Sequence, residues 1–162
     1  MTGPKLLGVS IAIPIGLIAA AIIIPCRMPP GKGANEYSAA ASVRTINAAE
    51  EVYRTTYGGY AGSLANLRGA APCSPSVATA CLLHQVLASG LKSGYKFTAI
   101  GGNPVNGANT TYVVGAAPVG YERTGNRRFC STEKKIIRVD LNVSRSTTPP
   151  DSAQCAGFSA LQ

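Results

Sequence analysis

A long apolar run near the N-terminus restricts what this part of the chain can form. Leu6 to Ile24 reads LLGVSIAIPIGLIAAAIII and carries no charge. About 20 apolar residues are needed to cross a bilayer as a helix. A helix that is apolar on every side is rarely part of a small core, and membrane helices tolerate a proline such as Pro14 as a kink. The run therefore predicts a membrane-spanning helix.

Two other fates of this run remain open. Residues 19–21 are alanines and would suit signal-peptide cleavage, and Cys26 could carry a lipid after cleavage. The run is longer than the usual apolar core of a signal peptide, which favours an anchor. Pro25 stands before Cys26, where lipoprotein signals have a small residue, and this disfavours lipidation.

The five cysteines indicate an oxidising compartment. Cys26 is the odd one, and the others form an even set that fits two disulfides: Cys73, Cys81, Cys130 and Cys155. Three pairings of these four are possible. Pairing Cys73 with Cys81 and Cys130 with Cys155 is favoured because each bridge closes a local loop.

The sequence offers little material for metal binding or catalysis. Cys73, Cys81 and His84 could supply three zinc ligands, but structural zinc sites prefer four, and the spacing is not one of the common paired patterns. One histidine and seven acidic residues leave few acid–base pairs. Motifs for phosphate, dinucleotide or nucleophilic chemistry do not occur. We therefore expect no enzyme, no catalytic residue, no metal site and no cofactor.

The chain divides at a proline- and glycine-rich stretch, Pro25–Gly33, into residues 1–33 and 34–162. An amphipathic helix is predicted over 35–57, with Asn35 as its N-cap and Gly58 as its stop. Glu50 is placed to pair with Arg54 on its surface.

The rest of the chain predicts short elements. These are a helical turn at 63–68, a helix at 78–89, strands at 95–99, 110–116, 127–130 and 135–141, and an irregular tail. Consecutive strands without helices between them imply an antiparallel sheet. The predicted fold class is α+β: a long N-terminal helix, with a membrane part and an amphipathic part, packed on a small antiparallel sheet of three or four strands.

The net charge is +8, with 15 basic and 7 acidic residues. Six basic residues cluster late in the sequence and form a candidate anion or DNA patch: Arg123, Arg127, Arg128, Lys134, Lys135 and Arg138. A solvated basic face is the favoured interpretation, because the chain has no Trp and few aromatic residues near these positions.

Several segments resemble type IV pilins and type II secretion pseudopilins. The stretch 34–57, ANEYSAAASVRTINAAEEVYRTTY, is similar to the helix that follows the membrane segment in bacterial pilin-like proteins. The stretches 86–98, 125–129 and 136–138 look like the C-terminal part of those proteins. With the order of the predicted elements, the resemblance covers most of the chain.

The resemblance implies a structural subunit of a type IV pilus or a type II secretion filament. Its partners would be other pilin-like subunits and the inner membrane, and nucleic acid is not an expected partner. The subunit would cross the bacterial inner membrane once, with its head in the periplasm or in an extracellular filament. A disulfide often fixes the C-terminal loop of such heads, a role that Cys130 and Cys155 would take.

The resemblance also places a processing site, in a degenerate form. Alignment on Pro25 puts Gly3 at the cleavage position and Pro4 after it, while Gly8 stands where the family has an acidic residue. Three functions follow as alternatives: a pilin-like subunit, a membrane-anchored or lipidated periplasmic binding module, and a DNA-binding minor pilin.

Overall fold

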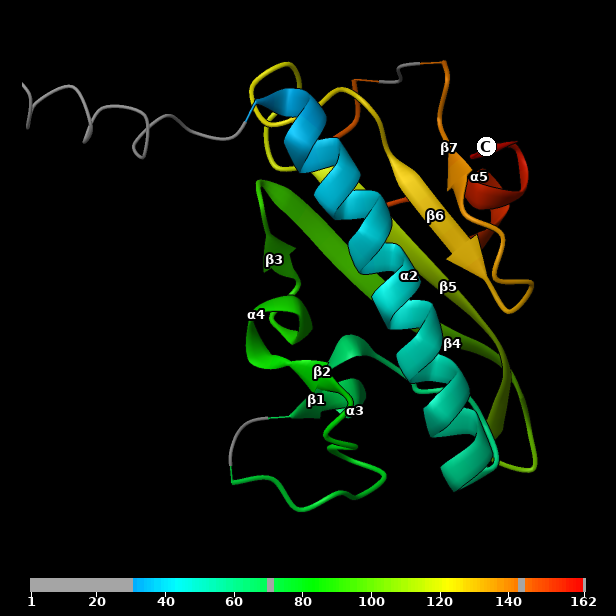
Figure 1. Ribbon diagram of the computed structural model, residues 1–162. Coiled ribbons are helices and arrows are strands. Elements are labelled where there is room, and N and C mark those ends of the chain that lie inside the picture. The colour runs from blue at the N-terminus through cyan, green and yellow to red at the C-terminus, as the bar shows by residue number, and fades with distance from the viewer. Residues whose placement is uncertain (1–30, 70–71, 143–144, 162) are drawn as a thin grey trace, which may run out of the picture.

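One long helix lies across one face of an antiparallel sheet (Figure 1). The structure is a computed structural model that describes residues 31–69, 72–142 and 145–161. The helices are α2 (Lys32–Tyr57), α3 (Leu64–Leu67), α4 (Gln85–Ala88) and α5 (Ser152–Ala156). The strands are β1 (Arg68–Gly69), β2 (Leu83–His84), β3 (Leu91–Lys92), β4 (Tyr95–Val105), β5 (Ala108–Pro118), β6 (Phe129–Thr132), β7 (Arg138–Val139) and β8 (Ser159–Ala160).

The helix α2 starts earlier than the sequence predicts. It begins at Lys32, after Gly31, so Asn35 lies inside the helix instead of capping it. The Asn35 side chain donates to the carbonyl oxygen of Thr124 at 2.9 Å. The predicted stop is confirmed: Gly58 has φ +82°, a left-handed conformation that suits glycine.

The predicted fold class is wrong in its membrane part. Within residues 31–69, 72–142 and 145–161, no helix is long and apolar enough to cross a membrane. The long helix in these residues is the amphipathic part alone, so neither the predicted membrane part nor the predicted single-pass location in the inner membrane is supported. The run 6–24 itself, Cys26 and the processing site at Gly3 and Pro4 all lie outside the described residues.

The sheet is also larger than predicted. Among the described residues, six strands form one antiparallel sheet in the order β3-β4-β5-β6-β7-β8, where three or four were expected. The two additional edge strands, β3 and β8, have two residues each. Such short edges have no periodicity that a sequence pattern could show.

The centre of the sheet is a long hairpin of β4 and β5, which pair from Tyr95–Pro118 to Val105–Ala108. The segment between the predicted strands 95–99 and 110–116 is therefore mostly strand. Asn106 and Gly107 form the turn with φ +50° and +82°. A two-residue turn of this kind matches the twist of the strands, so the ladder continues to the tip.

The predicted helix over 78–89 is wrong in its first half. Only Gln85–Ala88 is helical, and Leu83–His84 pairs in parallel with Arg68–Gly69. Cys81 has φ +61°, which no α-helix accepts, and it is bonded to Cys73. The disulfide and this tertiary pairing override the local helical preference.

The main core fills the space between α2 and the sheet. Its helix side contains Ala39, Val43, Ile46 and Tyr53, and its sheet side contains Tyr95, Phe97, Tyr112, Val114 and Phe129. A second, smaller cluster consists of Val113, Cys130 and Cys155 with Phe158. Val113 and Cys130 alternate with residues of the main core, so this cluster lies on the face away from α2.

Candidate functional site

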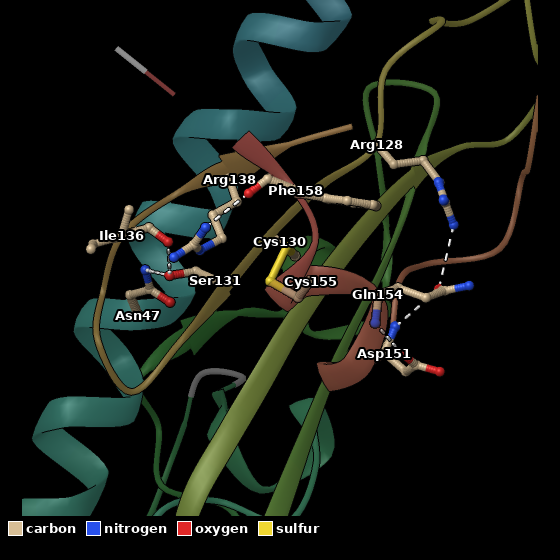
Figure 2. Close-up of a disulfide and its surroundings, with 10 residues drawn as sticks. All are labelled: Asn47, Arg128, Cys130, Ser131, Ile136, Arg138, Asp151, Gln154, Cys155 and Phe158. Atoms are coloured by element: carbon tan, nitrogen blue, oxygen red, sulfur yellow. Dashed lines mark hydrogen bonds between the residues drawn. A yellow bond between two sulfur atoms is a disulfide. The ribbon is translucent and has the colours of Figure 1, made fainter. Parts of the chain in front are cut away.

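Both predicted disulfides are present. Cys130 on β6 is bonded to Cys155 on α5, with 5.8 Å between their Cα atoms (Figure 2). Cys73 is bonded to Cys81 in the loop between β1 and β2. These are the two local pairings that the sequence favoured. The Cys130–Cys155 disulfide fixes the C-terminal segment to the face of the sheet that lies away from α2.

Hydrogen bonds at the start of α5 also stabilise the C-terminal segment. The Asp151 carboxylate accepts from the Gln154 backbone N–H at 2.8 Å, and the Gln154 side chain accepts from the Asp151 N–H at 3.3 Å. This reciprocal arrangement is a capping box, which satisfies free N–H groups at a helix start. The D-x-x-Q pattern was readable in the sequence, but the tail was expected to be irregular.

The possible zinc ligands do not form a metal site. Cys73 and Cys81 are bonded to each other in a disulfide, so neither has a free thiol to bind a metal. The His84 Nδ1 accepts from the Val86 backbone N–H at 3.3 Å and thereby caps α4. Across the parts of the chain that the structure describes, no three Cys, His, Asp or Glu side chains are grouped for a metal ion.

Arg128, which the sequence placed in the basic patch, is instead a buried structural residue. Only 6% of it is exposed. Its Nε and Nη2 donate to Oδ2 of Asp140 at 3.1 and 2.8 Å, and its Nη1 reaches Oε1 of Gln154 at 3.5 Å. Its guanidinium also lies 5.2 Å from the centre of the Phe158 ring. Arg128 therefore ties β6 to the C-terminal segment.

The other five basic residues do not form one surface. Arg127 lies 3.6 Å from Glu36 at the start of α2, and Lys135 lies 3.0 Å from Glu51 further along the helix. Arg123 is exposed in the loop before β6.

The remaining two basic residues, Lys134 and Arg138, share a cleft that lies away from Arg123, Arg127 and Lys135. Lys134 and Arg138 line it together with Thr111 and Thr132, and Arg138 donates to the carbonyl oxygen of Phe158 at 2.8 Å (Figure 2). The candidate anion patch is therefore divided over separate sites.

Glu50 was predicted to make a surface pair with Arg54, and this is wrong. Its exposed fraction is 0%, and Arg54 pairs with Glu51 instead. One oxygen of Glu50, Oε2, accepts from the Ala61 backbone N–H at 2.9 Å, while Oε1 has no hydrogen-bond partner among the described residues. Burial raises the pKa of Glu50 to about 7, and the Ala61 hydrogen bond opposes this in part.

A buried polar network joins α2 to the sheet. Asn47 donates to the Ser131 hydroxyl at 2.8 Å and accepts from the Tyr112 hydroxyl at 3.1 Å. Ser131 in turn donates to the carbonyl oxygen of Ile136 at 3.0 Å (Figure 2). The network fixes the position of the helix along β5 and β6, because a shift of one turn would leave these groups unpaired.

Two adjoining hollows, which we call the α2 groove, lie along one flank of the helix, beside its buried face. One has a volume of about 440 Å³ and is lined by Arg44, Asn47, Ala48, Glu51, Val52 and Lys135. The other, of about 410 Å³, is lined by Gly33, Glu36, Tyr37, Ala40, Arg44, Arg127, Phe129 and Leu161. Arg44 borders both. Tyr37 is 76% exposed and Val52 48% exposed, so the groove offers apolar surface to solvent.

Comparisons with known proteins find no relative: no protein-family model, no curated protein and no solved structure matches the chain. Its functional assignment therefore depends on the geometry described above.

Proposed function

We propose that this chain is a pilin-like or pseudopilin-like structural subunit of a type IV pilus or type II secretion filament, and that it acts by assembly and not by catalysis. The observation that carries the proposal is the double use of α2. One side of this helix is buried against an antiparallel sheet, and the flank next to it borders the α2 groove. A helix with a buried side and an open apolar side is suited to packing against neighbouring subunits.

Three further features agree with this proposal. The helix, with 26 residues, is much longer than the other helices in the described residues. The Cys130–Cys155 bridge holds the C-terminal segment on the sheet, which is the role expected from the resemblance. The charges along the α2 groove alternate in sign, with Glu36 and Glu51 beside Arg127 and Lys135. Such alternation can set the register of a contact between copies.

A pair of valine variants tests the proposal. Val52 lines the α2 groove and is 48% exposed, whereas Val86 lies on α4 and is 51% exposed. In cells with the native assembly machinery, Val52→Glu should reduce the amount of subunit in sheared filaments about tenfold or more. Val86→Glu should leave it unchanged, and both variants should keep the melting temperature of the parent chain.

Two results would contradict the proposal. The first is the absence of the parent chain from sheared filaments. The second is an equal effect of Val52→Glu and Val86→Glu on filament content, since the contact would then not involve the α2 groove.

A further inference from the structure

The end of α2 and the turn of the β4–β5 hairpin lie at the same end of the molecule (Figure 1). Another hollow is lined by residues of these two segments and of the loop that follows α2. Its volume is about 450 Å³, within the range of small-molecule sites. It is bordered by three tyrosines and three asparagines, and we call it the tyrosine–asparagine cleft: Tyr53, Tyr57, Tyr60, Asn66, Asn106 and Asn109. Among the described residues that line it, none carries a charge.

The walls of this cleft are fixed by the fold. The Tyr60 backbone N–H donates to the carbonyl oxygen of Asn109 at 2.9 Å, and the Asn109 side chain donates back to the carbonyl oxygen of Tyr60 at 3.2 Å. A Cβ on Gly59 would lie 2.8 Å from Cβ of Ala108, so glycine is required where these segments meet. The site is therefore preformed, which lowers the entropic cost of binding.

The aromatic rings are held by their neighbours. The ring centres of Tyr53 and Tyr57 are 4.7 Å apart, and those of Tyr60 and Tyr112 are also 4.7 Å apart. The Tyr53 hydroxyl donates to the carbonyl oxygen of Val77 at 2.8 Å. Packed tyrosines of this kind present apolar ring carbons beside polar groups at little cost in conformational entropy.

Several polar groups of the cleft have no assigned role in the fold. Within the described residues, no hydrogen bond engages the hydroxyls of Tyr57 and Tyr60, the side-chain amide of Asn106 or the side-chain oxygen of Asn109. These groups combine donors and acceptors without charge. Arg54, whose guanidinium lies 5.8 Å from the centre of the Tyr60 ring, is itself paired with Glu51.

We propose that the tyrosine–asparagine cleft binds a neutral carbohydrate. Sugar hydroxyls both donate and accept, which matches amide and phenol groups, and the C–H faces of a pyranose ring fit against aromatic carbons. The absence of lining charges disfavours phosphate-bearing ligands, and nucleic-acid binding depends on phosphate contacts to Lys and Arg. The cleft begins at Tyr53, after Val52 of the α2 groove, and the two share no lining residue, so variants can change one without removing a side chain of the other.

Saturation-transfer NMR on the full chain tests the proposal with three neutral probes: maltotriose, cellotriose and N,N′-diacetylchitobiose. At least one should show transfer that saturates with concentration. The double variant Tyr57→Phe/Tyr60→Phe removes only the two free hydroxyls, and it should weaken that binding about three- to tenfold. Asn106→Gly should also weaken binding while it preserves the left-handed backbone of the turn.

Tyr37→Phe is the matched control, because Tyr37 is an exposed tyrosine in the α2 groove. It should leave carbohydrate binding unchanged. The proposal is overturned if none of the three probes shows saturable transfer up to millimolar concentration. Binding that persists in both cleft variants overturns it as well, and so does equal or tighter binding of glucose 6-phosphate at the cleft.

Discussion

Glu50 accepts a hydrogen bond from the backbone N–H of Ala61 at 2.9 Å, at the point where the chain leaves α2 and returns along the end of the sheet. The second oxygen of this carboxyl group has no hydrogen-bond partner among the described residues, although the side chain is fully buried. A buried carboxyl group with one satisfied oxygen is more stable when protonated. The contact thus joins the helix end to the following loop and makes folding sensitive to pH.

The stability of the protein should fall as pH rises through the range in which Glu50 ionises. Its pKa is raised from 4.5 to about 7, so between these values the folded state binds more protons than the unfolded chain. The free energy of unfolding therefore decreases across this window, by about 3 kcal/mol if the whole shift is expressed, and is level above pH 7. Urea unfolding of the parent chain and of Glu50→Gln at pH 4.5, 6 and 7.5 measures this decrease in the free energy of unfolding.

The neighbouring carboxylate provides the control. Hydrogen bonds from Arg54 and Lys135 lower the pKa of Glu51, so this residue cannot produce a loss of stability on raising pH. Glu51→Gln should keep the fall in stability between pH 4.5 and 7, and Glu50→Gln should lack it. An identical pH dependence in both variants would refute the role of Glu50.

Arg128→Ala should destabilise the protein strongly. The change removes the two hydrogen bonds that Arg128 donates to Oδ2 of Asp140 in a buried setting, and breaking such a pair typically costs about 3–5 kcal/mol. Arg127→Ala is the matched control, because Arg127 is exposed and lies 3.6 Å from Glu36. It should cost less than about 1 kcal/mol. Equal losses in the two variants, measured by chemical denaturation, would argue against a structural role for Arg128.

Asn47→Ala should cost about 1–3 kcal/mol, because it leaves the hydroxyls of Tyr112 and Ser131 without their amide partner in the core. Ser38→Ala on the same helix removes an exposed hydrogen bond to Ser93 and should change stability by less than about 0.5 kcal/mol. Thermal unfolding of the two variants, analysed with the same heat-capacity change, compares their stabilities. A loss in Asn47→Ala no larger than that in Ser38→Ala would mean that the network contributes nothing.

The two disulfides should differ in their contribution to stability. Cys130 and Cys155 are 25 residues apart, and Cys73 and Cys81 are 8 apart. In the chain-entropy model these loops correspond to about 3.5 and about 2.5 kcal/mol. The Cys130→Ser/Cys155→Ser variant should also exchange the Leu161 amide hydrogen faster, since that N–H bonds to Ile137 at the sheet edge. An unchanged exchange rate at Leu161 would show that α5 and β8 stay packed on the sheet without the disulfide.

The amphipathic helix and the central strands were predictable because their signals are local. The spacing of Ala39, Val43, Ile46 and Tyr53 defines one face of a helix, and alternation at Tyr95, Phe97 and Ala99 defines a strand. Gly58 marked the end of α2 for the same reason. The cysteine pairing also followed from local separation along the chain.

The sequence-based predictions were wrong where contacts between distant parts of the chain determine the structure. The burial of Arg128 depends on Asp140 and Gln154, and the burial of Glu50 depends on the loop at Ala61. Position 50 follows Ile46 by four residues and precedes Tyr53 by three, which puts it on the buried face of the helix, but a glutamate there was predicted to lie on the surface. The tyrosine–asparagine cleft had no linear signal, because Tyr60 and Asn109 meet across a sequence separation of 49 residues.

The contacts of α2 have a consequence for synthesis of the protein. The Glu36 carboxylate binds the backbone N–H of Asn126, 90 residues later in the chain. At a translation rate of about 5–20 residues per second, the ribosome needs roughly 5–20 seconds to make that intervening length. During this interval the sheet that covers the apolar side of α2 is incomplete, because β4, β5 and β6 are made only in its last part. Nascent chains of this protein should therefore depend on a holding chaperone that shields amphipathic helices until β6 has emerged.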